Sequence, residues 1–270
     1  TFGLPDSPGI PNDLAKKTLS CEFNNKEDFL KIFNKVKKVL AAVIIEPIAG
    51  NMGFVPSDKS FLKLLRKKTN ENKSLLIFDE VITGFGRMGT PFATQKFNVQ
   101  PDIITMAKAL TNGAIPMGGV AVTDEIYDTV TNAAPENAIE FFHGYTYSAH
   151  PAACAAGIAT QKIYESEGIF ERSAALEDYF LNAIWTLQDH PLVADIRGIG
   201  LMAGVEVHSD GAPGRRGGQM QKDMFWNGLH VKWTGDNAIV APAFVAERKH
   251  IDEIVDKFRK TLDETLEASV

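Results

Sequence analysis

Leu75-Leu76-Ile77-Phe78-Asp79-Glu80-Val81 is an unbroken apolar run that ends in two acidic residues and a valine, which is typical of a strand buried on both faces. Before it, residues 59–69 repeat apolar side chains with a helical period, and residues 103–106 form a second short apolar run. The same alternation occurs earlier, with a helical pattern over residues 27–40 and an apolar run over residues 41–45. Alternating helices and apolar strands predict an α/β fold with a mostly parallel sheet sandwiched by helices.

The C-terminal part of the chain has a different pattern, which indicates a second domain. A long helical pattern over residues 152–187 is followed by a glycine-punctuated strand over residues 195–207. Two short strands and an amphipathic last helix follow, over residues 229–233, 238–241 and 247–266. We therefore expect a large domain over residues 1–165 and a small C-terminal α/β domain over residues 166–270.

Shorter patterns fill the connections between these elements. Residues 92–97 predict a short helix, and residues 117–123 predict a further strand. The first twenty residues carry turn-forming residues without a period, so we expect the chain to begin inside a loop. Residues 211–218 are rich in glycine and arginine and predict a solvated connection.

Composition and charge limit the classes of partner. A chain of 270 residues with 44% hydrophobic and 23% charged residues can bury a large core. Its net charge of −6 gives no electrostatic footprint for nucleic acid or anionic lipid, so we expect small molecules and copies of the chain itself as partners. No apolar run approaches the roughly 20 residues that cross a bilayer. Cys21 and Cys154 form no disulfide framework and no metal-ligand spacing, and we expect a cytoplasmic protein without a metal site.

Charged residues end three of the predicted strands. Glu46, Asp79 and Lys108 each follow an apolar run, and ligands of α/β sheets collect at the carboxyl ends of strands. Position alone makes these three residues candidates for one cofactor site. Residues two apart on a strand point to the same face, so Asp79 and Val81 are expected on one side and Glu80 on the other.

These side chains suit the chemistry of pyridoxal 5'-phosphate (PLP). A carboxylate such as Asp79 would keep the pyridine nitrogen protonated, and the flat side chain of Val81 would lie against the ring. The amine of Lys108 would condense with the aldehyde of PLP to form a Schiff base and would then shuttle protons. A partly buried lysine with a lowered pKa suits both tasks.

Four motifs, in order along the chain, carry a resemblance to a known family. They are residues 45–50 (IEPIAG), 77–87 (IFDEVITGFGR), 106–113 (MAKALTNG) and 145–151 (YTYSAHP). Together they resemble the class III aminotransferases of the fold type I PLP enzymes. The resemblance implies Asp79 on the pyridine nitrogen, Lys108 as the Schiff-base lysine and Thr146 as a phosphate ligand given to the cofactor of the neighbouring subunit. It therefore implies a homodimer with shared active sites and a partial PLP-binding domain over residues 1–165.

The two halves of the chain resemble different members of this family. Residues 1 to about 85, with residues 3–9 and 50–53, are similar to glutamate-1-semialdehyde 2,1-aminomutase. The remainder, with residues 142–147 and 195–202, is similar to omega-amino-acid:pyruvate transaminases of the beta-alanine type. We favour the transaminase because the stretch that holds Lys108 and Thr146 belongs to it. The implied reaction moves an amino group from an omega-amino acid or amine to pyruvate or a similar keto acid.

Two features depart from the transaminase pattern. In that group an arginine of the small domain commonly receives the substrate carboxylate, whereas here the corresponding stretch offers Lys232, which lacks the bidentate fork of a guanidinium. An amine donor is therefore plausible, and Trp233 is a candidate for lining the substrate pocket as well as for core packing. The chain also resembles the C-terminal two-thirds of a family member, so the family's phosphate-binding glycine and serine or threonine loop is expected ahead of Thr1.

Three alternative interpretations remain beside the transaminase. The first is the aminomutase, and the second is a non-catalytic protein that keeps the PLP fold. The third is a dinucleotide-binding oxidoreductase, because residues 84–89 formally match G-x-G-x-x-G. Against it, the charges of Asp79 and Glu80 would oppose a pyrophosphate, and Pro91 stands where the motif requires a helix.

Overall fold

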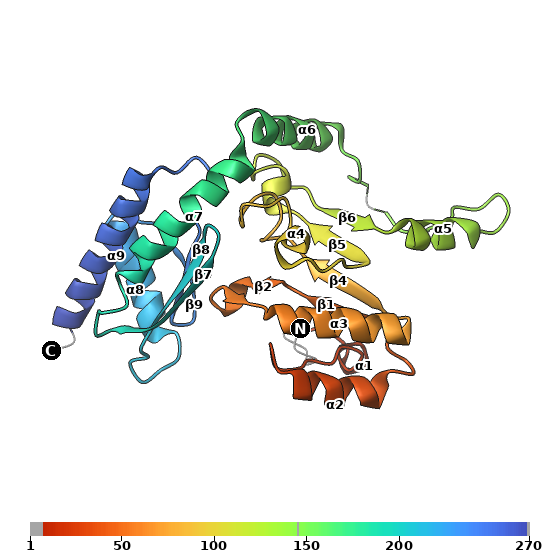
Figure 1. Ribbon diagram of the computed structural model, residues 1–270, viewed down its shortest axis with the longest axis horizontal. Helices are drawn as coiled ribbons and strands as arrows, with labels where there is room; N and C mark the ends of the chain where they lie inside the picture. The colour runs from red at the N-terminus through yellow and green to blue at the C-terminus, as the bar shows by residue number, and fades with distance from the viewer. Residues whose placement is uncertain (1–7, 145, 269–270) are drawn as a thin grey trace. The chain divides into compact units, whose positions relative to one another are not determined.

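The computed structural model describes residues 8–144 and 146–268 (Figure 1). It divides into two compact units: one comprises Thr1–Val43 and Ser57–Leu76, and the other comprises Ile44–Pro56 and Ile77–Val270. The division expected near residue 165 differs from this one and stays a prediction. Most of the predicted motif over residues 3–9, together with Tyr145, lies outside the described residues.

Phenylalanine rings join helices α2 and α3 of the first unit, which also contains α1. The ring of Phe29 lies 5.6 Å from that of Phe33 and 6.1 Å from that of Phe61. Asn25 caps α2 by accepting hydrogen bonds from the amides of Glu27 and Asp28, which explains where this helix begins. The helix ends at Val36, earlier than the pattern predicted. The bounds are α1 (Asn12–Ala15), α2 (Lys26–Val36) and α3 (Lys59–Asn72).

A four-stranded sheet in the order β1-β4-β5-β6 aligns the predicted strand ends. Its strands are β1 (Ala42–Ile45), β4 (Leu75–Asp79), β5 (Ile103–Met106) and β6 (Gly119–Val122). Strands β4 and β5 are parallel, with Asp79 opposite Thr105, whereas β6 is antiparallel to β5. The predicted α/β fold is confirmed as a mixed sheet with helices between its strands. The carboxyl ends of β4 and β5 therefore meet at one edge.

Short elements follow these strands and shape the region beyond their ends. The pair β2 (Ile48–Ala49) and β3 (Val55–Pro56) is antiparallel and encloses the 3-10 helix η1 (Gly50–Met52). The other connecting elements are α4 (Ala93–Phe97), the 3-10 helix η2 (Lys108–Leu110) and α5 (Asp124–Asn132). The sequence patterns did not predict α5, which has no buried residue.

The helical pattern predicted over residues 152–187 forms two helices. They are α6 (Pro151–Ser166) and α7 (Ile169–Trp185), and they are separated at Gly168, whose φ of 57° lies in the left-handed region. Glycine adopts this region without a Cβ clash, so the chain can turn there. The helical pattern extends as predicted, with a break at Gly168 that the sequence pattern did not indicate.

A second sheet forms the core of the C-terminal part, in the antiparallel order β7-β8-β10-β9. Phe180, Phe258 and Trp233 belong to the hydrophobic cluster that this sheet shares with four helices, α6, α7, α8 and α9. The glycine-punctuated strand predicted over residues 195–207 is a hairpin with a turn at Gly200. The elements are β7 (Val193–Ile199), β8 (Met202–Val207), α8 (Arg215–Trp226), β9 (Lys232–Thr234), β10 (Asn237–Val240) and α9 (Arg248–Glu267).

Helix α8 corrects the predicted loop over residues 211–218. Helix α8 begins at Arg215, and its Gly217 packs against Gly235. A Cβ on Gly217 would lie 2.1 Å from the Gly235 carbonyl oxygen, so this close contact needs glycine. Tertiary packing thus outweighs the low helix propensity of glycine. No helix in the described ranges is long and apolar enough to cross a membrane.

Candidate active site

The charged residues predicted at the strand ends lie close together. Glu46 follows β1, Asp79 ends β4, and Lys108 begins η2 two residues after β5. The charges of Asp79, Glu46 and Lys232 all act on the ammonium group of Lys108. We call Lys108, Asp79, Glu46 and Lys232 the charged cluster. It brings Lys232 of the C-terminal part within electrostatic range of Lys108.

Lys108 has a lowered pKa although its side chain is exposed. The largest cause is partial burial of the ammonium, which penalises the charged form. Asp79 and then Glu46 oppose this effect because their negative charges favour the ammonium, whereas the positive charge of Lys232 lowers the pKa further. The neutral, nucleophilic amine is therefore populated at a lower pH than in an ordinary lysine.

The backbone of Lys108 is strained. Its φ of 44° lies in the left-handed region, which costs energy for a residue with a Cβ. A compact turn keeps it there, since the Leu110 amide donates to the Ala107 carbonyl at 2.9 Å and the Gly113 amide donates to the Lys108 carbonyl at 3.3 Å. Such strain is common where a side chain must be held in a functional position.

Asp79 and Val81 are neighbours for a reason other than the predicted one. Strand β4 ends at Asp79, so Val81 lies in the following turn and strand alternation does not apply to it. Instead, the Val81 amide donates a hydrogen bond of 3.1 Å to Oδ1 of Asp79. Both side chains are half-buried. The carboxylate and the apolar side chain thus lie together beyond the strand.

Glu80 is buried just after β4 and has a structural role that the sequence did not reveal. Its buried carboxylate accepts hydrogen bonds from the Ala93 amide at 2.7 Å, the Thr94 amide at 3.1 Å and the Thr83 hydroxyl at 2.7 Å. The Glu80 carboxylate therefore accepts hydrogen bonds from the first amides of α4. Phe92 occupies the cap position, but its side chain has no acceptor for these amides. Burial raises the pKa of Glu80 despite these donors.

The two residues predicted on the substrate side point in opposite directions. Lys232 is exposed on β9, and its Nζ donates a hydrogen bond of 2.6 Å to Oδ1 of Asn51 in η1. Trp233 is 8% exposed, and its ring lies 6.2 Å from that of Phe258 in the core. This position matches the core-packing alternative for Trp233, and a substrate contact by its side chain stays a prediction.

Thr146 lies in an exposed segment rich in aromatic side chains. Phe142 is 93% exposed and Tyr147 is 78% exposed on either side of it. Thr146 is itself exposed and lies in a turn, so its hydroxyl is open to a second molecule. The role of Thr146 at the cofactor of a neighbouring subunit stays a prediction.

Glycines of the formal dinucleotide motif have a packing function. A Cβ on Gly86 would lie 2.5 Å from the ring of Phe170. A Cβ on Gly89 would lie 2.7 Å from the Cβ of Ala174. Both contacts are with α7, and the next helix, α4, begins only at Ala93. A dinucleotide site requires a helix that begins within the glycine motif. The oxidoreductase interpretation is therefore wrong.

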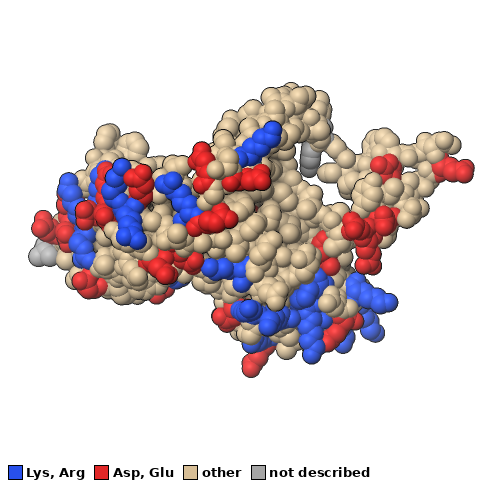
Figure 2. Space-filling model, turned by 45° about the horizontal axis from the view of Figure 1, so that its top comes forward, with Lys and Arg blue, Asp and Glu red and all other residues tan. Residues whose placement is uncertain are grey.

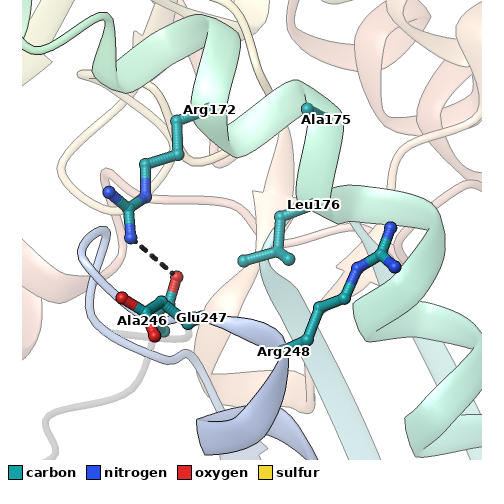
Figure 3. A pocket seen from close by; sticks show the side chains of 6 residues that line it. All are labelled: Arg172, Ala175, Leu176, Ala246, Glu247 and Arg248. Carbon is teal, nitrogen blue, oxygen red and sulfur yellow. Dashed lines mark hydrogen bonds between the residues drawn. The ribbon is translucent and has the colours of Figure 1, made fainter.

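A small cavity of about 280 Å³ lies between α7 and the start of α9 (Figure 3). Figure 3 shows Arg172 directed towards the 246–247 backbone, where its Nη2 donates to the Ala246 carbonyl at 3.3 Å. No residue of the charged cluster lines this cavity, and no group of three or more potential metal ligands occurs among the described residues. The lining residues are Arg172, Ala175, Leu176, Ala246, Glu247 and Arg248.

Comparison with known proteins agrees with the fold. The model of the class III aminotransferase family matches residues 4–262, and the chain belongs to this family. It is 41% identical over 268 residues to an omega-aminotransferase of Caulobacter vibrioides, covering 96% of the chain and 60% of the relative. It is 41% identical over 226 residues to a beta-alanine–pyruvate aminotransferase of Pseudomonas aeruginosa, covering 83% of the chain and 50% of the relative.

Solved structures show the same relationship. The structure of an (S)-enantioselective omega-transaminase from Thermomicrobium roseum superposes with a TM-score of 0.83 at 35% identity, covering 89% of the chain and 55% of that chain. The chain thus spans between half and about three-fifths of the length of these relatives. The family resemblance expected from the four motifs is confirmed.

The residues of the charged cluster fit PLP, the cofactor of this family. A half-buried carboxylate at the end of a parallel strand suits a pyridinium nitrogen, and Val81 beside it suits the ring face. An exposed amine with a lowered pKa suits a covalent bond to the aldehyde. The donor set is therefore the one that PLP requires at its ring and aldehyde.

Proposed function

We propose that this chain transfers an amino group from an omega-amino acid or amine to pyruvate or a similar keto acid. The observation that carries this proposal is the charged cluster, in which the Lys108 amine has a lowered pKa beside Asp79. The names of the relatives, omega-aminotransferase and beta-alanine–pyruvate aminotransferase, support the substrate class. They favour transamination over the aminomutase and over a fold without activity.

Each residue near the cofactor has a distinct task in this proposal. Lys108 would hold the cofactor covalently through Nζ and would act as the base for the proton on the carbon that carries the donor's amino group. Asp79 would keep the ring nitrogen protonated, and Val81 would pack against the ring. Glu46, whose Oε2 accepts a hydrogen bond of 3.0 Å from the Gly50 amide, borders the site. PLP, when bound, supplies the electron sink that stabilises the developing carbanion.

Lys232 is the proposed contact for the far end of the amino donor. Its ammonium is a point charge that donates a hydrogen bond to one carboxylate oxygen, without the two-pronged geometry of an arginine. The hydrogen bond to Asn51 gives this ammonium a neutral partner when the donor is an amine. Both omega-amino acids and simple amines are therefore donors in the proposed reaction.

The proposed assembly is a homodimer with shared active sites, in which Thr146 binds the cofactor phosphate of the partner. Exposed apolar side chains of α6 and the preceding segment support a second copy as their cover, since such patches mark interfaces. They include Phe142, Tyr147, Ile158 and Ile163. Figure 2 shows few charged side chains over α6. The proposed location is cytoplasmic, which agrees with the free thiols of Cys21 and Cys154.

Covalent trapping tests the assignment of Lys108. The purified chain is mixed with PLP, the lysine–cofactor bond is made permanent with borohydride, and the labelled peptide is identified by mass spectrometry. We expect labelling at Lys108 in the wild type and no corresponding label or visible absorbance band in Lys108→Ala. The amine is selected because burial lowers its pKa below the ordinary value of 10.5.

Lys73→Ala is the matched control for this experiment. Lys73 is an exposed lysine with a φ of 55°, so its replacement by alanine has a similar backbone cost to that at Lys108. We expect Lys73→Ala to be labelled like the wild type. Labelling spread evenly over many lysines, or an unchanged absorbance band in Lys108→Ala, would contradict the proposed function.

A further inference from the structure

Helix α6 holds the turn that carries Lys108. We propose that Tyr164 is a positioning residue for the amino-transfer reaction, because its hydroxyl fixes the carbonyl next to Lys108 and thereby fixes the direction of the reactive amine. The inference rests on the proposed role of Lys108 and adds a residue that touches neither substrate nor cofactor.

The first observation is a pair of hydrogen bonds from one face of α6 to η2. Tyr164 is buried, and its Oη donates to the Ala109 carbonyl at 2.7 Å. One turn earlier, Nε2 of Gln161 donates to the Leu110 carbonyl at 3.3 Å. Residues three apart lie on the same helix face, so the two donors act together. They satisfy consecutive carbonyls that a three-residue 3-10 helix leaves without internal partners.

The second observation is that Lys108 depends on its backbone for its position. Its side chain is exposed, so packing does not hold it, and its φ of 44° is unfavourable for any residue except glycine. A strained conformation persists only where its surroundings impose it. The hydrogen bond from Tyr164 to the adjacent Ala109 is such a constraint.

The third observation is that Tyr164 is itself held on its other side. Its ring lies 5.8 Å from that of Phe244 in an edge-to-face arrangement, and the guanidinium of Arg87 lies 4.3 Å from the Phe244 ring centre. Nη1 of Arg87 donates to the Pro242 carbonyl at 2.5 Å. Residues 242–244 follow β10, so the small antiparallel sheet is connected to the Lys108 turn through Arg87, Phe244 and Tyr164.

The protonation states in this connection favour a persistent hydrogen bond. Burial raises the pKa of Tyr164 above its ordinary value of 10.0, and the positive charge of Arg87 opposes the shift without cancelling it. The Tyr164 hydroxyl therefore keeps its proton and remains a donor throughout the neutral range. Burial lowers the pKa of Arg87 to about 10, so its guanidinium also remains charged at neutral pH.

The test is the pH dependence of PLP trapping at Lys108 in the full chain, compared between wild type and Tyr164→Phe. Loss of the hydroxyl frees the turn, Lys108 becomes more solvated, and its amine returns towards the ordinary lysine pKa. We expect the labelling midpoint to rise by roughly half a pH unit, which is about a threefold loss of labelling at a fixed lower pH.

Tyr179→Phe is the matched control because the Tyr179 hydroxyl also makes a short hydrogen bond, of 2.6 Å, to Oδ1 of Asp252 at the surface. We expect no shift of the Lys108 midpoint in this variant. Gln161→Leu is a second test variant, which removes the longer hydrogen bond and is expected to shift the midpoint in the same direction by less. It carries the test if circular dichroism shows that Tyr164→Phe is unfolded.

Three outcomes separate this proposal from the proposed function. A raised midpoint in Tyr164→Phe, or in Gln161→Leu, with an unchanged midpoint in Tyr179→Phe supports the positioning role. Unchanged midpoints in both α6 variants, with normal labelling of Lys108 in the wild type, overturn the positioning role and leave the function intact. Absence of Lys108 labelling in the wild type overturns the function and this inference together.

Discussion

Lys232 is a second cation within electrostatic range of Lys108, and like charges disfavour each other's protonated form. In the charged cluster the two carboxylates raise the pKa of Lys108, whereas the ammonium of Lys232 lowers it. The reactivity of the amine depends on this balance as much as on burial. A residue proposed to select the substrate therefore also influences the pKa of the lysine proposed to be catalytic.

Replacing Lys232 by methionine tests this influence. Removal of the neighbouring positive charge favours the ammonium form, so we expect the pKa of Lys108 to rise by a few tenths to about one pH unit. The midpoint of PLP trapping at Lys108 should shift upwards by the same amount. Lys232→Arg keeps the charge and is the control, with an expected midpoint close to that of wild type. A lower midpoint in Lys232→Met would contradict this account.

At the scale of elements, the hairpin of β7 and β8 connects the small sheet to the segment after β4. Gly200 forms its turn with a φ of 61°, and a Cβ there would lie 2.2 Å from the Arg87 carbonyl oxygen and 2.7 Å from Cα of Met88. The next residue, Leu201, donates its amide to the same Arg87 carbonyl at 2.8 Å. The turn thus needs glycine for its conformation and for the close approach of the backbones.

Gly200→Ala should therefore destabilise the protein by about 2 to 4 kcal/mol, since the left-handed φ and the clash with backbone atoms both add cost. The matched control is Gly235→Ala, because Gly235 has a φ of 58° and open space where its Cβ would lie. For this variant we expect a loss of about 1 kcal/mol from the conformation alone. Urea unfolding followed by circular dichroism measures both values, and equal losses would contradict the close-approach argument.

The elements also show what the sequence could predict. Strand β4 was predicted because its residues form an unbroken apolar run, and helix α9 because its apolar residues repeat with a helical period. Helix α8 was not, because its glycines lower the local helix propensity and the packing against Gly235 that compensates is not visible in the sequence. The hairpin at Gly200 looked like one strand because a glycine does not show whether the chain continues or reverses.

The same distinction applies to the charged cluster. Glu46, Asp79 and Lys108 were predictable because parallel strands bring their carboxyl ends to one edge. The opposite directions of Lys232 and Trp233 follow from strand alternation, but the hydrogen bond of Lys232 to Asn51 joins residues far apart in sequence. The capping role of Glu80 was hidden for the same reason, since its donors belong to the turn at Thr83 and to α4.

At the scale of the whole molecule, the proposed dimer distributes each active site over two chains. Lys108 and Thr146 of one chain would then serve different cofactors, because Thr146 reaches the phosphate in the partner's site. This arrangement separates the covalent step from part of the phosphate binding. A variant at Lys108 on one chain and a variant at Thr146 on the other would therefore leave one of the two sites of a mixed dimer with both wild-type residues.

Mixing two variants tests the shared site. Lys108→Ala cannot be labelled, and Thr146→Val should be labelled weakly at limiting PLP. In a mixed dimer one site contains both wild-type residues, so random mixing should restore about a quarter of the wild-type labelling. Mass spectrometry of the Lys108 peptide measures this recovery. A mixture that shows only the average of the separate variants would contradict shared sites.

The left-handed backbone at Lys108 also bears on evolution and engineering. Glycine at this position would relieve the strain, so the chain without its reactive amine is expected to be the more stable one. Selection for thermal tolerance alone would thus favour loss of the lysine, and the lysine at this position carries a stability cost that its proposed role would explain. Consensus or stability-guided redesign of this chain should accordingly exclude position 108 from its search.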